Sequence, residues 1–527
     1  MSSSATESGK TENGIVFSKT NSYDDLGRLL SFEYNTSATN PFTVSYTYVG
    51  DSEQGTTTNL VASVDIGGKK LSYTYDEDGN ITEIWENGTL KESYEYDSLN
   101  QMVRENNLDN NKTILYTYDK SGNIREKKIY AYTTEENLDS LSFKFIDYTY
   151  DDENWGDLLT AYNGKAITYD EIGNPLSYRS GMTFQWSGGR KLTSFSTPNA
   201  VGNYVYNADG IRVYKEVNGN KTEYYLNGTE IETEITNFGG ITRRVDYIYD
   251  ENGSIYGFVV DNTAKYYYTK NLQGDIIGIL DASGTQIVEY SYDAWGKATV
   301  SYPNADSLTE AQKQANYLLG SNNPFRYRGY YFDNETGFYY LNSRYYDPEV
   351  GRFINADVFV STGQGIIENN MFAYCLNNPA INIDASGFWA ERYSGFSWTN
   401  TGFNLNVQLC FLSQSFCLIY AADIIRMKGQ WYWWGKGYKK MSVTRIAQEL
   451  WFHALVYYTG SPVKTILNKV GVSWGWLNSQ LDHASYMEIN NNDKRSWVFA
   501  LVWNSVYSVK YVMRRTIGYG FPYWYIR

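Results

Sequence analysis

One short turn motif recurs along most of this chain and limits its fold more than any other feature. The motif is Tyr-Asp-x-x-Gly-Asn/Lys/Arg followed by an apolar residue, and it recurs, with substitutions, at residues 22–29, 74–81, 95–102, 117–124, 168–175, 205–212, 248–255 and 291–298. Alternating runs such as KLSYTY (70–75) precede it, and period-two alternation is typical of a β-strand. Asp can accept main-chain hydrogen bonds two residues on, and Gly accepts a positive φ. Each unit is therefore predicted to be a β-hairpin.

These hairpins cannot be independent of one another. A single hairpin is only marginally stable, so the units must stack edge to edge and bury their strand edges. We therefore expect a mainly β fold in which a long antiparallel sheet coils. Unrelated hairpins in a β-sandwich are the alternative, which would explain the alternation but not the recurrence of one turn motif.

Tyrosine usage agrees with a sheet of this kind. The 527 residues include 52 Tyr and only 23 Phe, and tyrosine is dense in the stretch YYFDNETGFYYLNSRYYDPEVGRF at 330–353. A tyrosine ring can pack while its hydroxyl finds water or a polar partner. We expect Tyr330, Tyr331, Tyr339, Tyr340, Tyr345 and Tyr346 to be buried against the inner face of the sheet.

One helix is expected to interrupt the strands, at 305–320. Ser307 and Glu310 have the spacing of a capping box, and Gly320 offers a stop. We expect this helix to serve packing rather than function.

Charge divides the chain near Phe388. From that residue to the end there are 15 Lys and Arg but only six Asp and Glu, which gives a net charge of +9. Residues 1–387 then carry a net charge of −23. Eleven of the 15 Trp, both His and two of the three Cys also lie beyond it. Cys375, Cys410 and Cys417 are too few for a disulfide framework. An acidic body and a basic, Trp-rich tail are therefore predicted to be separate parts.

The Tyr-Asp motifs resemble the YD repeats of RHS proteins and teneurins. The stretch NPFRYRGYYFDNETGFYYLNSRYYDPEVGRFINAD (323–357), followed by NMFAYCLNNPAINIDASG (370–387), is similar to the RHS repeat-associated core. The resemblance implies a hollow β-shell plugged by the core region and followed by a variable C-terminal domain. The division expected from it is a disordered N-terminus at 1–19, a YD-repeat shell at 20–300, the core at 301–387 and a variable domain at 388–527.

The resemblance also implies a cleavage site at the core boundary. RHS cores resemble aspartyl proteases there and cut after a final Asp-Pro-x-Gly-Leu motif. Asp384 and Gly387 match that motif, whereas Ala385 and Phe388 depart from it, and the earlier motif retains only Asp357. Two close carboxylates could share one proton for such chemistry. By resemblance, the bond cut would be Phe388–Trp389, and the alternative is that both aspartates only form turns.

The tail at 388–527 is predicted to be α+β, with a strand meander near 401–434 and helices after 441. Glu449 and His453 would share one helix face, and His483 follows on the next helix, which makes them weak candidates for an active site. Their spacing fits no metal signature, so no metal and no cofactor is expected. No run is apolar and long enough for a simple spanning helix, although a basic helix on anionic lipid remains an alternative to a buried one.

Three functions are compatible with these features. The first is a toxin-like delivery protein whose shell encloses or presents the tail as cargo, with a cognate immunity protein and an anionic target, nucleic acid or membrane surface. The second is a structural or adhesive surface protein, and the third is an enzyme in its own right. The difference in composition at Phe388 favours the first. No apolar secretory segment is visible near the start, yet the resemblance implies a secreted or cell-surface location.

Overall fold

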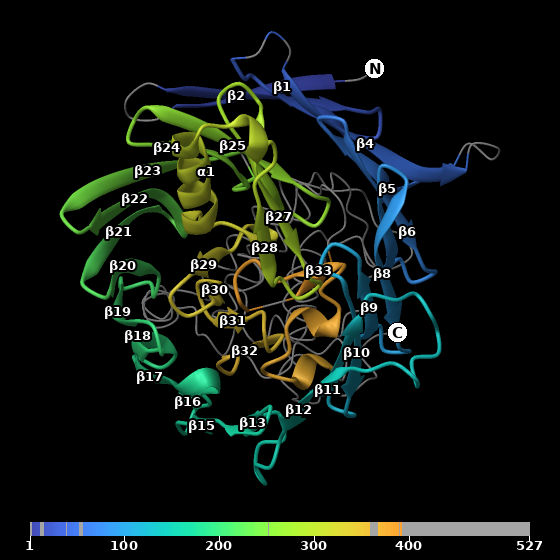
Figure 1. Cartoon of the computed structure of the whole chain (residues 1–527), viewed down its shortest axis with the longest axis vertical. Helices are drawn as coiled ribbons and strands as arrows, with labels where there is room; N and C mark the ends of the chain where they lie inside the picture. The colour runs from blue at the N-terminus through green and yellow to red at the C-terminus, as the bar shows by residue number, and fades with distance from the viewer. Residues whose placement is uncertain are drawn as a thin grey trace, which may run out of the picture. The chain divides into compact units, whose positions relative to one another are not determined.

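Two long antiparallel sheets make up most of the described protein. The computed structural model describes residues 3–10, 15–37, 39, 41–51, 56–250, 252–358, 367–388 and 390–392. Within each sheet the strands follow one another in sequence order, so every strand pairs with its neighbours along the chain. Figure 1 shows the two sheets curving around the strands of the core segment. The mainly β prediction is confirmed.

The first sheet has fourteen strands, β1 (Ser3–Lys10), β2 (Val16–Tyr23), β3 (Leu29–Tyr34), β4 (Phe42–Asp51), β5 (Thr56–Ile66), β6 (Lys69–Tyr75), β7 (Ile81–Glu86), β8 (Thr89–Tyr96), β9 (Met102–Asn107), β10 (Lys112–Tyr118), β11 (Ile124–Ala131), β12 (Lys144–Thr149), β13 (Ala161–Tyr162) and β14 (Lys165–Ala166).

The second sheet also has fourteen, β15 (Thr168–Tyr169), β16 (Pro175–Tyr178), β17 (Met182–Ser187), β18 (Lys191–Ser196), β19 (Val201–Tyr206), β20 (Arg212–Val217), β21 (Asn220–Asn227), β22 (Glu230–Phe238), β23 (Ile241–Tyr249), β24 (Ile255–Val260), β25 (Ala264–Lys270), β26 (Ile276–Leu280), β27 (Gln286–Tyr292) and β28 (Ala298–Ser301). The single coiled sheet expected from the sequence is therefore divided in two. The division falls between β14 and β15, where strands shorten to two residues and too few ladder bonds remain to continue the sheet.

The core segment contributes smaller elements. A four-stranded sheet comprises β29 (Tyr331–Asp333), β30 (Phe338–Tyr340), β31 (Tyr345–Asp347) and β32 (Arg352–Phe353), and a two-stranded one comprises β33 (Asn382–Ile383) and β34 (Glu391–Arg392). Short 3₁₀ turns lie at Arg179–Gly181, Ala305–Ser307, Tyr327–Gly329, Ile367–Asn369 and Cys375–Asn377, and α1 spans Glu310–Asn322.

The Tyr-Asp turns show why the motif recurs. At Asp76, Oδ1 accepts the Asn80 amide at 2.8 Å, Oδ2 accepts the Asn80 side chain at 2.8 Å, and Gly79 adopts a φ of 74°. The same arrangement recurs at Asp119 and Asp170. One carboxylate thus closes each turn from both oxygens, which confirms the predicted hairpins.

The tyrosine of the motif has its own partner. Its hydroxyl donates to a main-chain carbonyl of an earlier strand, most often at that strand's first residue: Tyr75 to Val61, Tyr96 to Ile81, Tyr118 to Met102, Tyr150 to Ile124, Tyr206 to Leu192 and Tyr292 to Ile276. Each repeat is therefore tied to an earlier one through a side chain as well as through the strand ladder.

The six core tyrosines named above are all buried, with exposed fractions from 0 to 6 %. Their hydroxyls meet protein rather than water. Tyr339 donates to the Gly296 carbonyl at 2.9 Å and Tyr346 to the Trp295 carbonyl at 2.7 Å, both from the second sheet's last turn. The predicted burial is confirmed, and the hydroxyls also anchor the core to the sheet around it.

Two local expectations need correction. Strands β1 and β2 occupy the region expected to be a disordered N-terminus. From Phe17 onward β2 alternates between buried and half-buried positions, and Phe17 packs on Tyr256 and Tyr267 of the second sheet. The capping box of α1 is formed by Thr309 and Gln312 rather than by Ser307 and Glu310.

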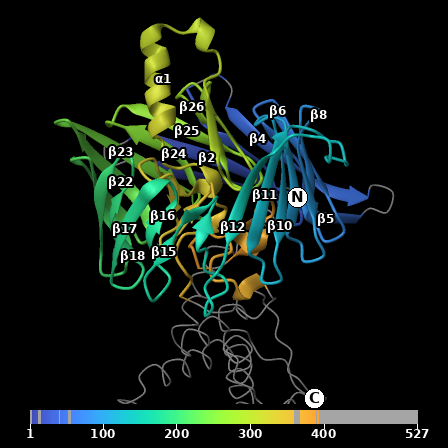
Figure 2. The same cartoon turned by 60° about the horizontal axis from the view of Figure 1, so that its bottom comes forward.

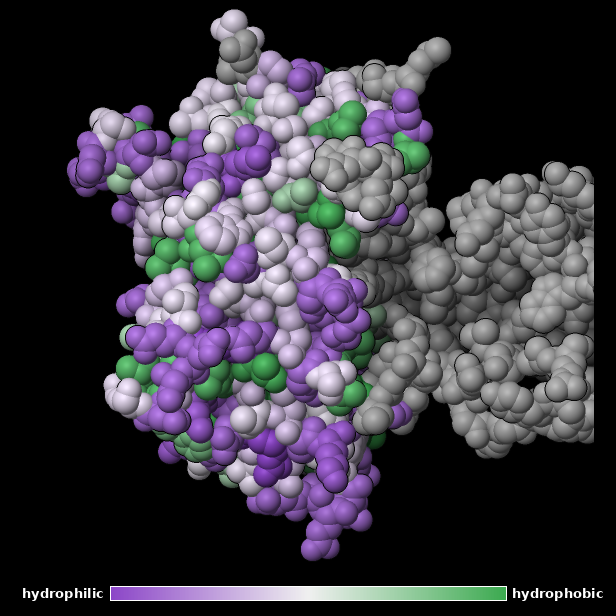
Figure 3. All heavy atoms as spheres, turned by 90° about the vertical axis from the view of Figure 1, so that its right-hand side faces the viewer, coloured by the Kyte–Doolittle hydropathy of each residue, from purple (hydrophilic) through white to green (hydrophobic). Residues whose placement is uncertain are grey.

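The Ser307 hydroxyl donates instead to the Asn304 carbonyl, inside the preceding 3₁₀ turn, so the cap falls two residues later. The helix also continues to Asn322, past the predicted stop at Gly320. Figure 2 shows α1 projecting beyond the sheets, while its C-terminal end packs on β27, where the Tyr290 hydroxyl donates to the Gly320 carbonyl at 2.7 Å. On the face of the molecule drawn in Figure 3, hydrophobic residues appear only in small separate groups.

Candidate functional site

Arg344 joins the two aspartates that the sequence singled out. It lies between β30 and β31, Asp357 follows β32, and Asp384 follows β33. The Nη2 atom of Arg344 lies 3.0 Å from Asp357 Oδ2 and 3.2 Å from Asp384 Oδ2. Because one nitrogen contacts both oxygens, the two Oδ2 atoms are no more than about 6 Å apart. Both side chains are largely buried, Asp357 at 8 % exposure and Asp384 at 1 %.

Asp384 is fixed by hydrogen bonds on several sides. Its main-chain amide donates to the Tyr330 hydroxyl at 2.9 Å, and its Oδ1 accepts the amide of Gly387 at 2.8 Å. The second of these bonds folds residues 384–387 into a tight turn. That turn holds the chain just before the predicted cleavage position against the carboxylate.

Gly387 itself has no room for a side chain. Its φ is +73°, and an added Cβ would lie 2.6 Å from Ser343 Oγ and 2.8 Å from the Leu341 carbonyl oxygen. Its own carbonyl accepts a hydrogen bond from Arg344 Nε. The adjacent Ser386 carbonyl accepts from the Ser343 hydroxyl at 2.7 Å. The segment leading to Phe388 therefore lies directly on the loop that carries Arg344.

Asp357 is positioned through Met371. Its amide donates to the Met371 carbonyl at 2.9 Å, and Arg344 Nη1 donates to the same carbonyl at 3.2 Å. Arg344 also covers the ring of Phe353, with its guanidinium carbon 3.5 Å from the ring centroid. A planar guanidinium held by a ring face and by several acceptors has little freedom to reorient.

The arrangement suits chemistry that needs two carboxylates. A dyad of this kind works when one group is ionised and the other protonated. In this structure each carboxylate has Arg344 as a partner, and this shared contact holds the two carboxylates close together. The Cys375 thiol nearby is not available as a thiolate, because burial and the negative charge of Asp384 raise its pKa well above the usual value.

Other residues of the core segment form hydrogen bonds with the turns of the first sheet. Asn377 donates to Gln101 Oε1 at 2.9 Å and to the Gly122 carbonyl at 2.7 Å. Asn370 donates to Asn123 Oδ1 at 2.7 Å, and Arg352 donates to the same oxygen at 3.1 Å. Gln101 and Asn123 are the residues that close two Tyr-Asp turns. The repeats thus position residues 370–384, and with them Asp384.

The second sheet holds the core through a buried ion pair. Arg212 makes two hydrogen bonds to Asp333, at 2.7 and 2.9 Å, inside a ring of tyrosines that includes Tyr204 and Tyr340. The pair fixes β29, and through it the tyrosine-rich sheet whose β30–β31 loop carries Arg344.

Sequence reasoning missed Arg344 and both asparagines. All three lie in the quoted core stretches, where several Arg and Asn residues are visible but nothing in the sequence assigns a partner to any of them. Glu449, His453, His483 and the predicted α+β tail, apart from residues 388 and 390–392, lie outside the described residues. Within the part of the chain that the structure describes, no three His, Cys, Asp or Glu side chains are placed to hold one metal ion. No described helix is long and apolar enough to cross a membrane.

Comparison with known proteins shows which family this chain is similar to. A family model for the teneurin YD-shell matches residues 35–129. The tRNA3(Ser)-specific nuclease WapA of Bacillus spizizenii is 33 % identical over 301 residues, which cover 56 % of this chain and 12 % of the nuclease. The chain belongs to the RHS/YD-repeat proteins. Its repeated Tyr-Asp turns are the YD repeats of that family.

A further relative and a solved structure are also similar to this chain. The double-stranded DNA deaminase toxin A of Burkholderia cenocepacia is 23 % identical over 354 residues, which cover 60 % of this chain and 22 % of the toxin. The crystal structure of TcdB2-TccC3 without its hypervariable C-terminal region matches with a TM-score of 0.54 at 20 % identity, over 73 % of this chain and 20 % of that one. The structural match shows that the two share the shell fold. This chain spans only a small part of each relative's length.

Proposed function

We propose that this protein is a polymorphic toxin of the RHS type. Its β-shell encloses or presents the basic, Trp-rich segment 388–527 as cargo, and a cut between Phe388 and Trp389 releases that cargo. Support comes from relatives that are named as a nuclease and as a deaminase toxin, and from the change in charge and composition at Phe388. A secreted or cell-surface location, a cognate immunity protein and an anionic target belong to the same proposal.

The observation that carries the proposal is the contact of one arginine with two aspartates and the Gly387 carbonyl. Cleavage would need one proton on the pair, so that one carboxylate activates water and the other protonates the leaving amine. Arg344 acts as a positioning residue: it holds both aspartates beside the turn at 384–387, because its Nη2 contacts each of them.

Expression of the full chain in a heterologous bacterium tests this function. We expect growth arrest with the wild-type chain and rescue with Asp384→Asn, because an amide cannot cycle the proton. Asp151→Asn is the matched control, since Asp151 is exposed and lies outside the core segment. Equal growth of all three strains would contradict release of a toxic cargo and would favour the structural surface protein instead.

A further inference from the structure

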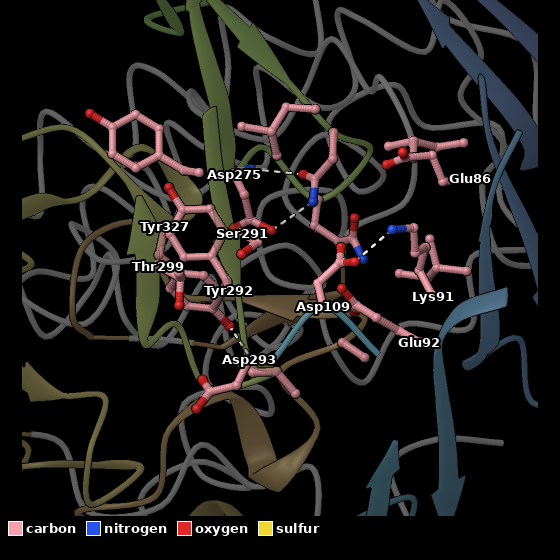
Figure 4. Close-up of a pocket in the computed structure, with 18 of the residues that line it drawn as sticks. Glu86, Lys91, Glu92, Asp109, Asp275, Ser291, Tyr292, Asp293, Thr299 and Tyr327 are labelled. Atoms are coloured by element: carbon pink, nitrogen blue, oxygen red, sulfur yellow. Dashed lines mark hydrogen bonds and ion pairs between the residues drawn. The ribbon is translucent and has the colours of Figure 1, made fainter. Parts of the chain in front are cut away.

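A cavity of about 370 Å³ lies between the two long sheets, away from Arg344. One wall comes from β6–β8 and the other from β26–β28, and Tyr327 and Arg328 close one side. Figure 4 shows Glu86, Lys91 and Glu92 on one wall and Ser291, Tyr292 and Thr299 on the opposite one. Its volume is within the range of small-molecule sites.

Carboxylates outnumber cations in this cavity. Its lining includes Glu86, Glu92, Asp109, Asp275, Glu289 and Asp293, against Lys69, Lys91 and Arg328. The three cations are already paired: Lys69 with Glu86 and Glu289, Lys91 with Asp109, and Arg328 with Asp275. Among the described residues, no cation lies within ion-pair distance of Glu92 or of Asp293. The cavity thus holds an excess of negative charge.

A second observation points to a missing hydrogen-bond donor. Gln273 lines the cavity and is only 4 % exposed, and its Oε1 has no hydrogen-bond partner within the described structure. A buried acceptor without a donor is costly and unusual in folded proteins. A ligand that brings N–H groups would satisfy it.

The apolar part of the lining is aromatic. Tyr73, Tyr94, Tyr290, Tyr292 and Tyr327 contribute to it. The face of an aromatic ring attracts cations, and it also packs well against methylene groups. Carboxylates, ring faces and an open acceptor together match an alkyl chain that carries ammonium groups.

We propose that this cavity binds a small aliphatic ammonium ligand of the diamine or polyamine class. One ammonium group pairs with Glu92, another with Asp293, and an N–H group donates to Gln273 Oε1. A single metal ion fits less well, because no three described carboxylates are placed around one point.

Ligand binding at this site should change the protonation of Glu92, and this change can be measured. Burial raises the pKa of Glu92, the hydrogen bond from the Tyr94 hydroxyl lowers it, and the charges of Asp275, Asp109 and Asp293 raise it, which together place this pKa at about 7. An ammonium group beside Glu92 would lower that pKa again. Binding near neutral pH should therefore release a proton from this carboxyl group.

Titration calorimetry of the full chain with spermidine at low salt tests the proposal. We expect one saturable site, with an enthalpy that changes with the ionisation enthalpy of the buffer because a proton is released. Glu92→Gln should weaken binding at least about tenfold and abolish the buffer dependence. Gln resembles the protonated acid in shape, so this variant should fold, as a thermal melt would verify.

Two controls separate this site from surface attraction. Glu171→Gln removes an exposed carboxylate of the same type outside the cavity, and it should bind as the wild type does. Gln273→Met should weaken binding while leaving the proton release in place. Butane-1,4-diol, which lacks charge, should not bind. Equal spermidine affinity in the wild type and Glu92→Gln, or no saturable binding in the wild type, would overturn the proposal.

Discussion

At the scale of single residues, Arg344 brings together groups that are distant in sequence. Asp357 and Asp384 are both visible as candidates from the resemblance to RHS cores, yet their common partner is not. The contact from Arg344 to Asp384 spans forty residues, and no local pattern predicts it. By contrast, the bonds within each Tyr-Asp turn span four residues, so the motif alone predicts them.

A substitution at Gly387 tests how closely the turn at residues 384–387 must pack against the loop that carries Arg344. Gly387→Ala places a Cβ at a positive φ and against Ser343 Oγ and the Leu341 carbonyl, so residues 386–388 must move away from Arg344. If cleavage occurs there, we expect it to slow about 100-fold, since small displacements strongly reduce such rates. The measurement is the rate of fragment formation on a denaturing gel. A stable variant that cleaves at the wild-type rate would contradict the role given to this turn.

Glu105 predicts a dependence of stability on pH. It is fully buried, and its pKa is raised to about 8, first by burial and then by Asp293, while the Ala294 amide, the Tyr116 hydroxyl and Glu92 complete its surroundings. An acid whose folded pKa exceeds its unfolded value of about 4.5 binds more protons when folded. Its contribution to stability is therefore present at low pH and is lost as the pH rises from about 4.5 to about 8.

Thermal melts between pH 5 and pH 8 check this sign. The wild type should lose more stability over that range than Glu105→Gln, which cannot ionise. Lys127 has a lowered pKa because of burial, so its effect runs in the opposite direction at higher pH. An identical pH dependence in the two proteins would show that Glu105 ionises normally.

At the scale of elements, strand order follows from local sequence and sheet division does not. Alternation and turn chemistry predict hairpins joined in sequence order, as found in both long sheets. The division after β14 depends on how few ladder bonds the short strands there can make, and the attachment of β2 to the second sheet depends on contacts between distant segments. From the sequence, residues 1–19 are expected to be disordered, whereas Phe17 and the Lys19–Asp250 ion pair, at 2.9 Å, attach β2 to the second sheet.

Substitutions at two turn glycines can distinguish the effect of backbone strain from the effect of contact with the core. Gly122 and Gly164 both have a positive φ, so Ala costs about 1–2 kcal/mol at each position. Only at Gly122 would the Cβ also press on Ile367 and on the Asn377 amide, at 3.1 and 3.2 Å. We expect Gly122→Ala to lower the melting temperature more than Gly164→Ala does. Equal shifts in melting temperature would mean that Ile367 and Asn377 of the core do not restrict the side chain at this turn.

At the scale of the whole molecule, the repeats and the core form one continuous structure that ends in the Asp357–Arg344–Asp384 contact. The YD turns hold Asn370 and Asn377, the second sheet holds Asp333 through Arg212, and both attachments converge on the boundary before Phe388. The repeats that build the wall therefore also position the two aspartates of the proposed cleavage site.

The most direct test of this account is the intact mass of the purified full chain. We expect two fragments of about 44 and 16 kDa, from cleavage between Phe388 and Trp389 in the 60.5 kDa chain. Asp357→Asn and Asp384→Asn should each give the uncut mass, while Asp151→Asn should be cut as the wild type is. An uncut wild-type chain, or normal cleavage in either core variant, would contradict the account and leave both aspartates as turn-forming residues.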